Sequence, residues 1–291
     1  MEFHLFLPQM RLSPAALRAR AEAAEAAGFT GLAVMDHLFP PGAADQPMYE
    51  ALTTVTWLAA VTERLRLGHL VLCDSFRHPA VLARQAVTLD HLSGGRFDLG
   101  IGSGSTPGEL SVYGFGSPTA AERVERLRET LVLLRGFWSG EPVDHHGTNF
   151  QVQGARQLPT PLDRLPIVIG GTGPKTMALV AEYADWWNVP MHQIDRLATA
   201  RASAGTARVS VQLLVTLITD ERSRDEVVAL SERRFGGMSQ QGRLVGTPSE
   251  LLPRLAALRD RGVERVYAWF TDFADPDTLS VFGREVIAAV D

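Results

Sequence analysis

Short apolar runs typical of buried strands alternate along the chain with longer stretches in which apolar residues recur at helical spacing. The first pair is the run Glu2–Leu7, followed by an amphipathic stretch over Ser13–Ala27. Ser13 is a good helix N-cap, and Gly28 suits the end of the same helix. The sequence therefore predicts a strand followed by a helix at the start of the chain.

The same pairing recurs to the end of the chain. We expect strands at Glu2–Leu7, Gly31–Met35, Leu65–Leu72, Arg96–Ile101, Leu165–Ile169, Asp185–Val189, Arg208–Thr219 and Arg265–Phe270. We expect helices at Ser13–Ala27, Glu50–Thr62, Pro79–Leu92, Ala120–Trp138, Pro174–Ala184 and Asp195–Ala204, then from about Asp220, at Thr247–Arg261 and at Pro276–Val290. Strict alternation demands a parallel sheet with crossover helices. Eight units favour an α/β TIM (β/α)8 barrel, with an open doubly wound sheet as the alternative.

Two segments interrupt this rhythm. Residues Gly140–Pro161 are polar and rich in turn residues, with short strand-like pieces such as Asn149–Val152. Residues Gly236–Val245 have the composition of a mobile loop. We therefore expect one domain over 1–291, with an insertion at about 140–161 and a mobile loop at about 236–245.

Composition narrows the class of protein. Hydrophobic residues make up 45% of the chain and charged residues 21%, which is typical of a globular protein. A net charge of -5 argues against a nucleic-acid binder. The chain has one cysteine, Cys73, which excludes an intrachain disulfide and a multi-cysteine zinc site. For His145 and His146, a position in a surface turn is favoured over a metal site. Lys175 is the only lysine.

The N-terminal residues lack the pattern of a signal peptide, and no apolar stretch approaches the ~20 residues of a membrane span. We therefore expect no membrane partner and a cytoplasmic location.

In a barrel the active site lies where strands end and helices begin. The second strand ends at Asp36-His37, a polar pair that either starts a turn or faces the site. The fourth ends in the glycine-rich Gly102-Ser103-Gly104-Ser105. This resembles a dinucleotide-binding loop, but no acidic residue follows at the expected ~20 positions. Three glycines from Gly100 onward still indicate that backbone is closely approached there.

The fifth strand ends in Gly170-Gly171-Thr172-Gly173, and a helix opens at Pro174. Unpaired N–H groups at a helix start attract phosphate, and glycines let phosphate reach the backbone. The spacing is not that of a Walker loop. An anion site is favoured here, with a simple turn as the alternative.

Taken together, these segments resemble the bacterial luciferase-like superfamily, and more narrowly its oxidoreductases that use the deazaflavin coenzyme F420. The resemblance covers nearly the whole chain. Its main carriers are Met35-Asp-His-Leu-Phe, Thr62-Glu-Arg-Leu-Arg-Leu-Gly-His-Leu-Val-Leu, Leu89-Asp-His-Leu-Ser-Gly-Gly-Arg-Phe-Asp-Leu-Gly-Ile-Gly, Ile169-Gly-Gly and Ala181-Glu-Tyr-Ala-Asp-Trp-Trp-Asn.

The resemblance implies a site in which a flavin or deazaflavin ring lies across the barrel mouth beside Asp36 and His37. A bulge at Leu70–Val71, often with a non-prolyl cis peptide in this family, would back the ring. Gly102, Ser103 and Gly104 would lie along the coenzyme tail. The phosphate would bind at Gly170, Gly171, Thr172 and Gly173, in agreement with the helix-terminus argument.

Two departures from the family bear on the substrate. Its F420-dependent sugar-phosphate dehydrogenases have a Trp soon after the Asp-His pair and a Glu just after the fourth-strand glycines, where this chain has Pro40-Pro41 and Ser105. A sugar phosphate is therefore disfavoured, and His37 is the one catalytic proton donor or acceptor that we expect. Candidates to line a substrate pocket are Met48, Tyr49, Tyr113, Phe115 and Met238.

We therefore predict an oxidoreductase that transfers a hydride between F420 and a small organic substrate. The first alternative is an FMN-dependent monooxygenase, which would use reduced flavin supplied by a flavin reductase, together with O2. The second is a catalytically silent barrel that binds a ligand. The resemblance also implies a possible homodimer.

Overall fold

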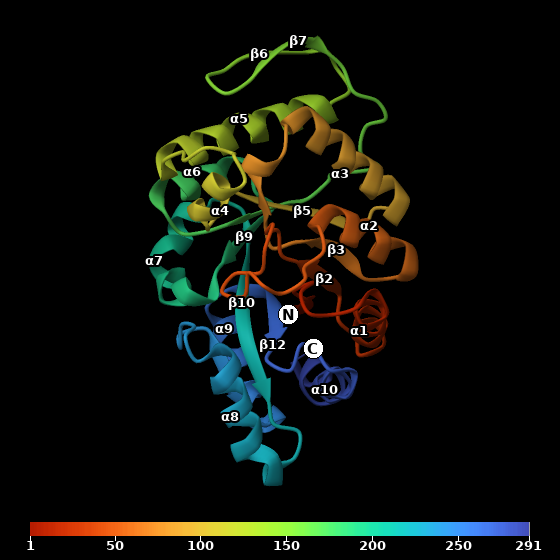
Figure 1. Ribbon diagram of the computed structural model, residues 1–291, viewed down its shortest axis with the longest axis vertical. Coiled ribbons are helices and arrows are strands. Elements are labelled where there is room, and N and C mark those ends of the chain that lie inside the picture. Colours follow the sequence, from red (N-terminus) through yellow and green to blue (C-terminus); the bar gives the residue numbers. More distant parts are fainter. Residues whose placement is uncertain (291) are drawn as a thin grey trace.

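A closed barrel of parallel strands forms the centre of the molecule in the computed structural model, which describes residues 1–290 (Figure 1). Within these residues the barrel has eight strands: β1 (Glu2–Phe6), β2 (Gly31–Val34), β3 (Arg66–His69), β5 (Phe97–Gly102), β8 (Ile167–Gly170), β9 (Trp186–Val189), β10 (Arg208–Leu217) and β12 (Val263–Phe270). They pair in that order, β12 also pairs with β1, and the β9–β10 pairing completes the ring. The TIM barrel prediction is confirmed.

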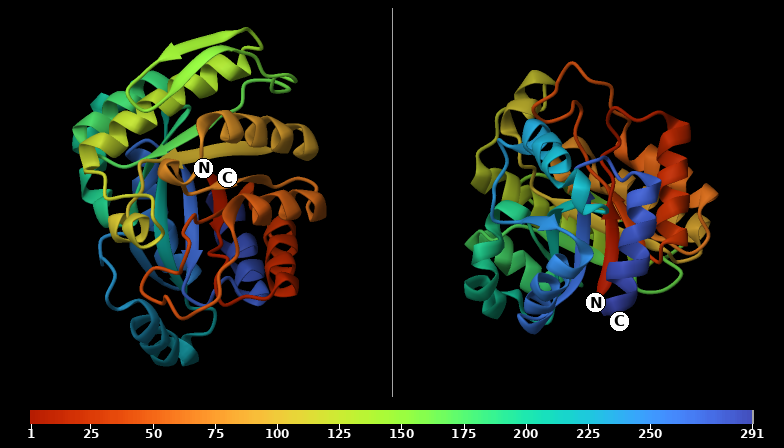
Figure 2. Two further views of the ribbon diagram at one scale, coloured as in Figure 1. Left: turned by 45° about the horizontal axis from the view of Figure 1, so that its top comes forward. Right: turned by 90° about the horizontal axis from the view of Figure 1, so that it is seen from below.

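Helices surround this barrel (Figures 1 and 2). They are α1 (Pro14–Ala26), α2 (Ala51–Val61), α3 (Pro79–Ser93), α4 (Pro107–Val112), α5 (Ala120–Trp138), α6 (Pro174–Tyr183), α7 (Leu197–Ala200), α8 (Arg224–Phe235), α9 (Pro248–Asp260), α10 (Pro276–Phe282) and α11 (Ala288–Val290). Short helical turns accompany them: η1 (Asp74–Phe76), η2 (Met191–Arg196), η3 (Arg201–Ala204), η4 (Glu221–Ser223) and η5 (Gly283–Ile287).

Local sequence explains most helix starts. Ser13 caps α1 with Pro14 in its first turn, and Thr119 forms a capping box with Glu122 at the start of α5. Strand β5 is buried along its whole length, because crossover helices cover the outer face of a parallel sheet while barrel side chains fill the inner one. None of the helices in residues 1–290 combines the length and apolar character that crossing a lipid bilayer requires.

The two interrupting segments are partly ordered. In the insertion, β6 (Val143–His146) and β7 (Gln151–Ala155) form an antiparallel hairpin that lies over α5 (Figure 2). In the segment predicted as a loop at 236–245, β11 (Arg243–Gly246) instead pairs with β10 outside the barrel ring. The prediction of a loop throughout 236–245 is therefore wrong at its C-terminal end.

Ionic side chains form a buried cluster among the barrel strands. Arg265 on β12 is 2% exposed and binds Asp98 on β5, with 2.9 Å between Nη1 and Oδ2. Arg66 binds the other Asp98 oxygen at 2.5 Å, and Glu2 also binds Arg265. Because a buried charge needs a partner, Arg265 and Asp98 depend on each other, while Glu2 and Arg66 are partly exposed.

Candidate active site

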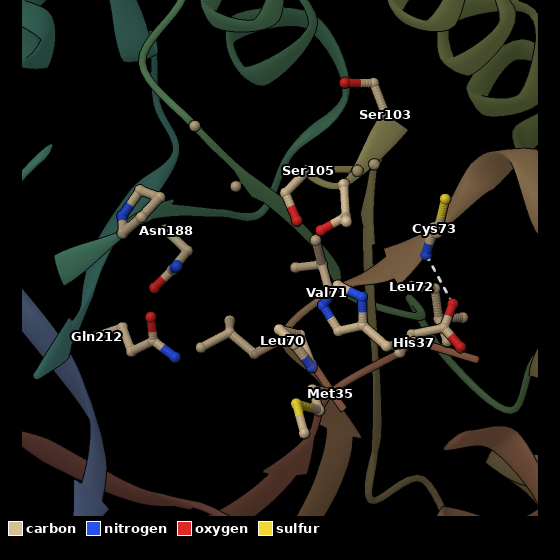
Figure 3. Close-up of a pocket in the computed structure, with 18 of the residues that line it drawn as sticks. Met35, His37, Leu70, Val71, Leu72, Cys73, Ser103, Ser105, Asn188 and Gln212 are labelled. Carbon is tan, nitrogen blue, oxygen red and sulfur yellow. Dashed lines mark hydrogen bonds between the residues drawn. The ribbon is translucent and has the colours of Figure 1, made fainter. Parts of the chain in front are cut away.

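A cavity of about 420 Å3 lies at the mouth of the barrel, where the sequence predicted the site. It is lined by the carboxyl ends of several strands and by the loops that follow them (Figure 3). Most of the predicted site residues contribute to one continuous wall: Asp36, His37, Leu70, Val71, Gly102, Ser103, Gly104, Gly170 and Gly171. The polar pair after β2 and the glycines after β8 therefore share one cavity.

His37 is held by a buried carboxylate that the sequence analysis did not predict. Its Nδ1 lies 2.9 Å from Oε2 of Glu109, which is 3% exposed and lies on the short helix α4. The other Glu109 oxygen accepts the N–H groups of Leu38 and Phe39. Because an ionised carboxylate only accepts hydrogen bonds, His37 donates through Nδ1, and Nε2 is left as an acceptor.

The sequence analysis placed Ser105 at the position where relatives carry a Glu and did not consider Glu109, four residues further along the chain. A signal was present in the sequence, because Thr106-Pro-Gly-Glu109 repeats the Thr-Pro-x-Glu spacing of the capping box Thr247-Pro-Ser-Glu250. At α9, Glu250 does cap its own helix by accepting the N–H of Thr247. At α4 the equivalent Glu109 turns away from its own N-cap to the segment after β2.

Asp36 lines the cavity but has its oxygens occupied. Its Oδ2 accepts the N–H of Cys73 at 2.7 Å, and both oxygens bind the guanidinium of Arg77. Arg77 also binds Glu50 at 2.7 Å. Asp36 therefore fixes the segment after β3 against the end of β2. The Cys73 thiol is unreactive, because burial raises its pKa to about 11.

The bulge predicted after the third strand is present. The Leu70–Val71 peptide is cis, and the chain resumes as β4 (Leu72–Cys73), which pairs with β5. A Cβ at Gly102 would lie 2.8 Å from a methyl of Val71, and one at Gly100 would overlap the carbonyl of His69. The expected close approach to the backbone at these glycines is therefore present, and the group that approaches Gly100 and Gly102 is the bulge itself.

The glycines after β8 leave open space on the wall. A Cβ at Gly170 would meet no protein atom nearer than 3.8 Å, and Gly171 has a φ of +121° that favours glycine. The carbonyl of Gly171 accepts the indole N–H of Trp187 at 2.7 Å, which fixes the loop. The N-cap of α6 is Gly173, and no side chain caps this helix, so its first N–H groups stay available to an anion.

Thr172 and Gly173, predicted to bind the phosphate, do not line this cavity. The Thr172 hydroxyl donates to Oε1 of Gln193 at 2.8 Å, and its side chain faces a neighbouring hollow beside Pro174 and Arg196. Gln193 lines the main cavity, so Thr172 reaches the site through this hydrogen bond.

Two amide side chains that the sequence analysis missed form the wall opposite His37. Asn188 lies on β9 and Gln212 on β10, and Figure 3 shows both beside Leu70. The hydroxyl of Ser210 donates to Oδ1 of Asn188 at 3.2 Å. The signal for Gln212 was the spacing of two between Ser210 and Gln212 within an apolar strand, which places both on one face.

Of the five side chains predicted to line a substrate pocket, Met238 alone does so among the described residues. Tyr49, Tyr113 and Phe115 are 41–48% exposed, and Met48 packs beside the cluster around Met10. Those four predictions are wrong, because the loops after β2 and β5 expose the three aromatic side chains to solvent and Met48 packs against that hydrophobic cluster. The same loops do reach the cavity through smaller residues, Pro41, Ser105 and Thr106.

The residues present fit a planar ring with a phosphate-bearing tail. The barrel mouth has a cavity of a size usual for cofactor sites. Its wall includes backbone without side chains at Gly170 and Gly171, and the start of α6 beyond these glycines has no side-chain cap. No cluster of three or more metal-ligating side chains occurs within residues 1–290.

Known proteins resemble this chain in sequence and in fold. The family model described as luciferase-like monooxygenase matches residues 1–240. A protein of Microbacterium testaceum named F420-dependent glucose-6-phosphate dehydrogenase is 31% identical over 268 residues, covering 87% of this chain and 78% of that protein. The chain spans about half the length of four further relatives of the same name.

Two solved structures share the fold. An F420-dependent secondary alcohol dehydrogenase, solved with an F420-acetone adduct, has a TM-score of 0.86 at 18% identity and covers 100% of this chain and 99% of that one. EDTA monooxygenase from Chelativorans has a TM-score of 0.85 at 17% identity, covering 100% and 93%. From its match to the family model and its identity to the Microbacterium protein, this chain belongs to the luciferase-like monooxygenase family.

Proposed function

We propose that this protein is an F420-dependent oxidoreductase that transfers a hydride between the deazaflavin and a small organic substrate. The observation that carries the proposal is the single cavity that joins His37 to the glycines at Gly170 and Gly171. The relative that matches 87% of the chain, and four further relatives that match 55–60% of it, are named for F420, which favours the deazaflavin over FMN. When bound, the coenzyme supplies a ring carbon that accepts or releases the hydride.

The chain's own residues would hold the coenzyme at three places. Leu70 and Val71 form a smooth apolar backing, and Gly170 and Gly171 leave the space that a side chain would fill. The N–H groups at the start of α6 would meet the phosphate. Asp36 contributes indirectly, because it holds the bulge through Cys73.

His37 would handle the proton. In the direction of oxidation, Nε2 of His37 would accept the proton of the substrate hydroxyl, and the bound coenzyme would supply the hydride acceptor, so that the substrate becomes a carbonyl compound. Glu109 is a positioning residue that fixes the imidazole through Nδ1 and stabilises the positive charge that forms on the ring. In the reverse direction the same Nε2 returns the proton to the substrate oxygen.

Titration of the purified protein with F420 and, separately, with FMN tests the cofactor. We expect saturable F420 binding, with a rise in the unfolding free energy of about 2.7 kcal/mol at one hundred times the dissociation constant. Tight binding of FMN without binding of F420 would instead favour the monooxygenase, which would need reduced flavin from a flavin reductase. The monooxygenase alternative is supported by the description of the matching family model.

A silent ligand-binding barrel is the remaining alternative. The Glu109–His37 pair disfavours it, since a buried acid beside an imidazole is costly to keep without a use. This alternative would be supported if no compound in a panel of alcohols, enones, imines and aldehydes oxidised or reduced the bound F420.

Assembly and location stay predictions from the sequence. A homodimer is expected from the family resemblance, and sedimentation equilibrium measures it. A cytoplasmic location would be tested by fractionation of the source cells.

A further inference from the structure

Cationic side chains are missing from the cavity wall. Within residues 1–290, neither a lysine nor an arginine lines the cavity. Its carboxylates are Asp36 and Glu109, and its imidazoles are His37 and His192. Asp36 is neutralised by Arg77, so the charge that faces the interior comes mainly from the Glu109–His37 pair.

Two arginines bind residues of the cavity wall, and both are already engaged. Arg77 binds Asp36 and Glu50, and Arg123 donates to the carbonyl oxygens of Ser103 and Pro118. Neither belongs to the cavity lining. A phosphate or carboxylate group inside the cavity would therefore lose its hydration without gaining an ion pair, and it would lie near Glu109.

The wall opposite His37 instead offers neutral hydrogen-bonding groups. Asn188 is 3% exposed, and its Oδ1 is fixed by Ser210, while its NH2 group has no partner in the described chain. The amide of Gln212 likewise has no partner among residues 1–290. Figure 3 shows the side chain of Leu70 beside Gln212, and the apolar part of the same cavity wall also includes Met35 and Trp269.

We propose that the substrate is an uncharged hydroxyl or carbonyl compound, and that Asn188 and Gln212 hydrogen-bond a neutral oxygen of it. This inference rests on the proposed F420-dependent function. It separates the chain from the activity for which its relatives are named, because glucose 6-phosphate carries a phosphate and no lysine or arginine lines this wall to neutralise it. Specificity of this kind comes from an unfavourable environment for the charged competitor.

Ligand binding to the F420-loaded protein tests the proposal without the need for turnover. The first probe is glucose 6-phosphate, titrated by calorimetry into the wild type, Gln212→Lys and the uncharged control Gln212→Met. We expect no saturable binding to the wild type or Gln212→Met, and saturable binding to Gln212→Lys with a dissociation constant at least ~10-fold below the lower limit that the wild-type titration sets, because of the new ion pair. Should Gln212→Lys not fold, Met238→Lys introduces the same charge from the loop after α8.

The second probe is a matched pair of ring compounds, cyclohexanone and 4-oxocyclohexanecarboxylate. We expect the ketone to bind at least ~10-fold more tightly than the carboxylate. Equal or tighter binding of the carboxylate overturns the proposal, as does glucose 6-phosphate binding to the wild type as tightly as to the lysine variant.

The same proteins separate the two levels of the argument. A chain that fails to bind F420 contradicts the proposed function, whereas a chain that binds F420 and also prefers the anionic ligands contradicts this inference alone. If Gln212→Met weakens F420 binding and leaves ketone binding unchanged, the amide serves the coenzyme, and its assignment to the substrate is wrong.

Discussion

A single carboxylate decides what His37 can do. Glu109 accepts from Nδ1 of the imidazole and from two backbone N–H groups of the next residues, so both the ring and its supporting backbone are held by one buried side chain. A hydrogen bond of this kind selects one tautomer, which leaves Nε2 ready to accept a proton. The chemistry of the site thus depends on an acid four positions beyond Ser105, where the sequence analysis found none.

The tautomer of His37 provides a direct test of this arrangement. We expect nitrogen NMR of histidine-labelled wild type to show His37 with its proton on Nδ1. In Glu109→Ala the partner is lost, and a mixture of tautomers should appear. His146 is exposed and provides the control signal. An unchanged His37 spectrum in Glu109→Ala would remove Glu109 from the positioning role.

Replacement of His37 itself should separate binding from turnover. We expect His37→Ala to keep F420 affinity close to that of the wild type and to reduce kcat by about 10²-fold or more, because general acid–base catalysis contributes at this level. The measurement is steady-state kinetics on the first substrate identified, beside F420 titration. Equal losses of affinity and kcat would make His37 a binding residue.

At the scale of elements, two connections shape the cavity. The bulge between β3 and β4 is fixed by Asp36 and accommodated by the glycines of β5, while the turn between β8 and α6 is fixed by Trp187. Each connection has a bonding partner on another strand. The site is therefore built by strand neighbours rather than by flexible loops, which keeps it in place before any ligand arrives.

The turn after β8 can be tested with Gly170→Ala. Its added methyl has room among the protein atoms but occupies space on the cavity wall. We expect an unchanged melting temperature and a loss of F420 affinity of at least ~10-fold. Gly171→Asp should also abolish binding, but its φ of +121° adds backbone strain, so Gly170→Ala separates the two effects better. Undiminished affinity in Gly170→Ala would place the coenzyme elsewhere.

At the scale of the whole molecule, the barrel and the site differed in how far the sequence could predict them. Strand ends at Asp36-His37 and Gly170–Gly171 were found because the strand–helix alternation is local. Glu109 was missed because α4 is a short helix inside a glycine-rich stretch. Asn188 and Gln212 were missed because their meeting depends on the register of β9 and β10, which is set by closure of the whole ring.

The buried ion cluster should dominate the response of the fold to charge removal. Asp98→Ala leaves Arg265 buried with one partner fewer, and we expect the free energy of unfolding to fall by about 3 kcal/mol. The matched control is Glu125→Ala, which breaks an exposed pair with Arg128 and should change the unfolding free energy by less than about 1 kcal/mol. Urea denaturation of both variants compares them, and equal effects would contradict the assignment.

Acid sensitivity should depend on His69. Burial lowers the pKa of His69 to about 4, whereas a histidine in the unfolded chain has a pKa of about 6.5. Between these two pKa values the histidine of the unfolded chain is protonated, whereas His69 in the folded chain stays neutral. Stability therefore falls as the pH falls from about 6.5 towards 4. The contribution lost by pH 5 is about 2 kcal/mol.

We therefore expect His69→Gln to lose about 2 kcal/mol less than the wild type between pH 7 and pH 5 in urea unfolding. His4, whose pKa burial also lowers, keeps part of the acid sensitivity in this variant. His146→Gln, at an exposed position, should behave as the wild type does. A His69→Gln profile that coincides with the wild-type profile would show that His69 is not a source of the effect.

The position of Lys175 has a practical consequence. This side chain is exposed in the first turn of α6, directly after the glycines, and no other lysine exists in the chain. An amine-selective acylating reagent can therefore mark one side chain, beside the entrance to the barrel, and otherwise only the terminal amine. Mass spectrometry can compare the amount of that one adduct with and without a ligand, and a decrease would show that the ligand covers Lys175.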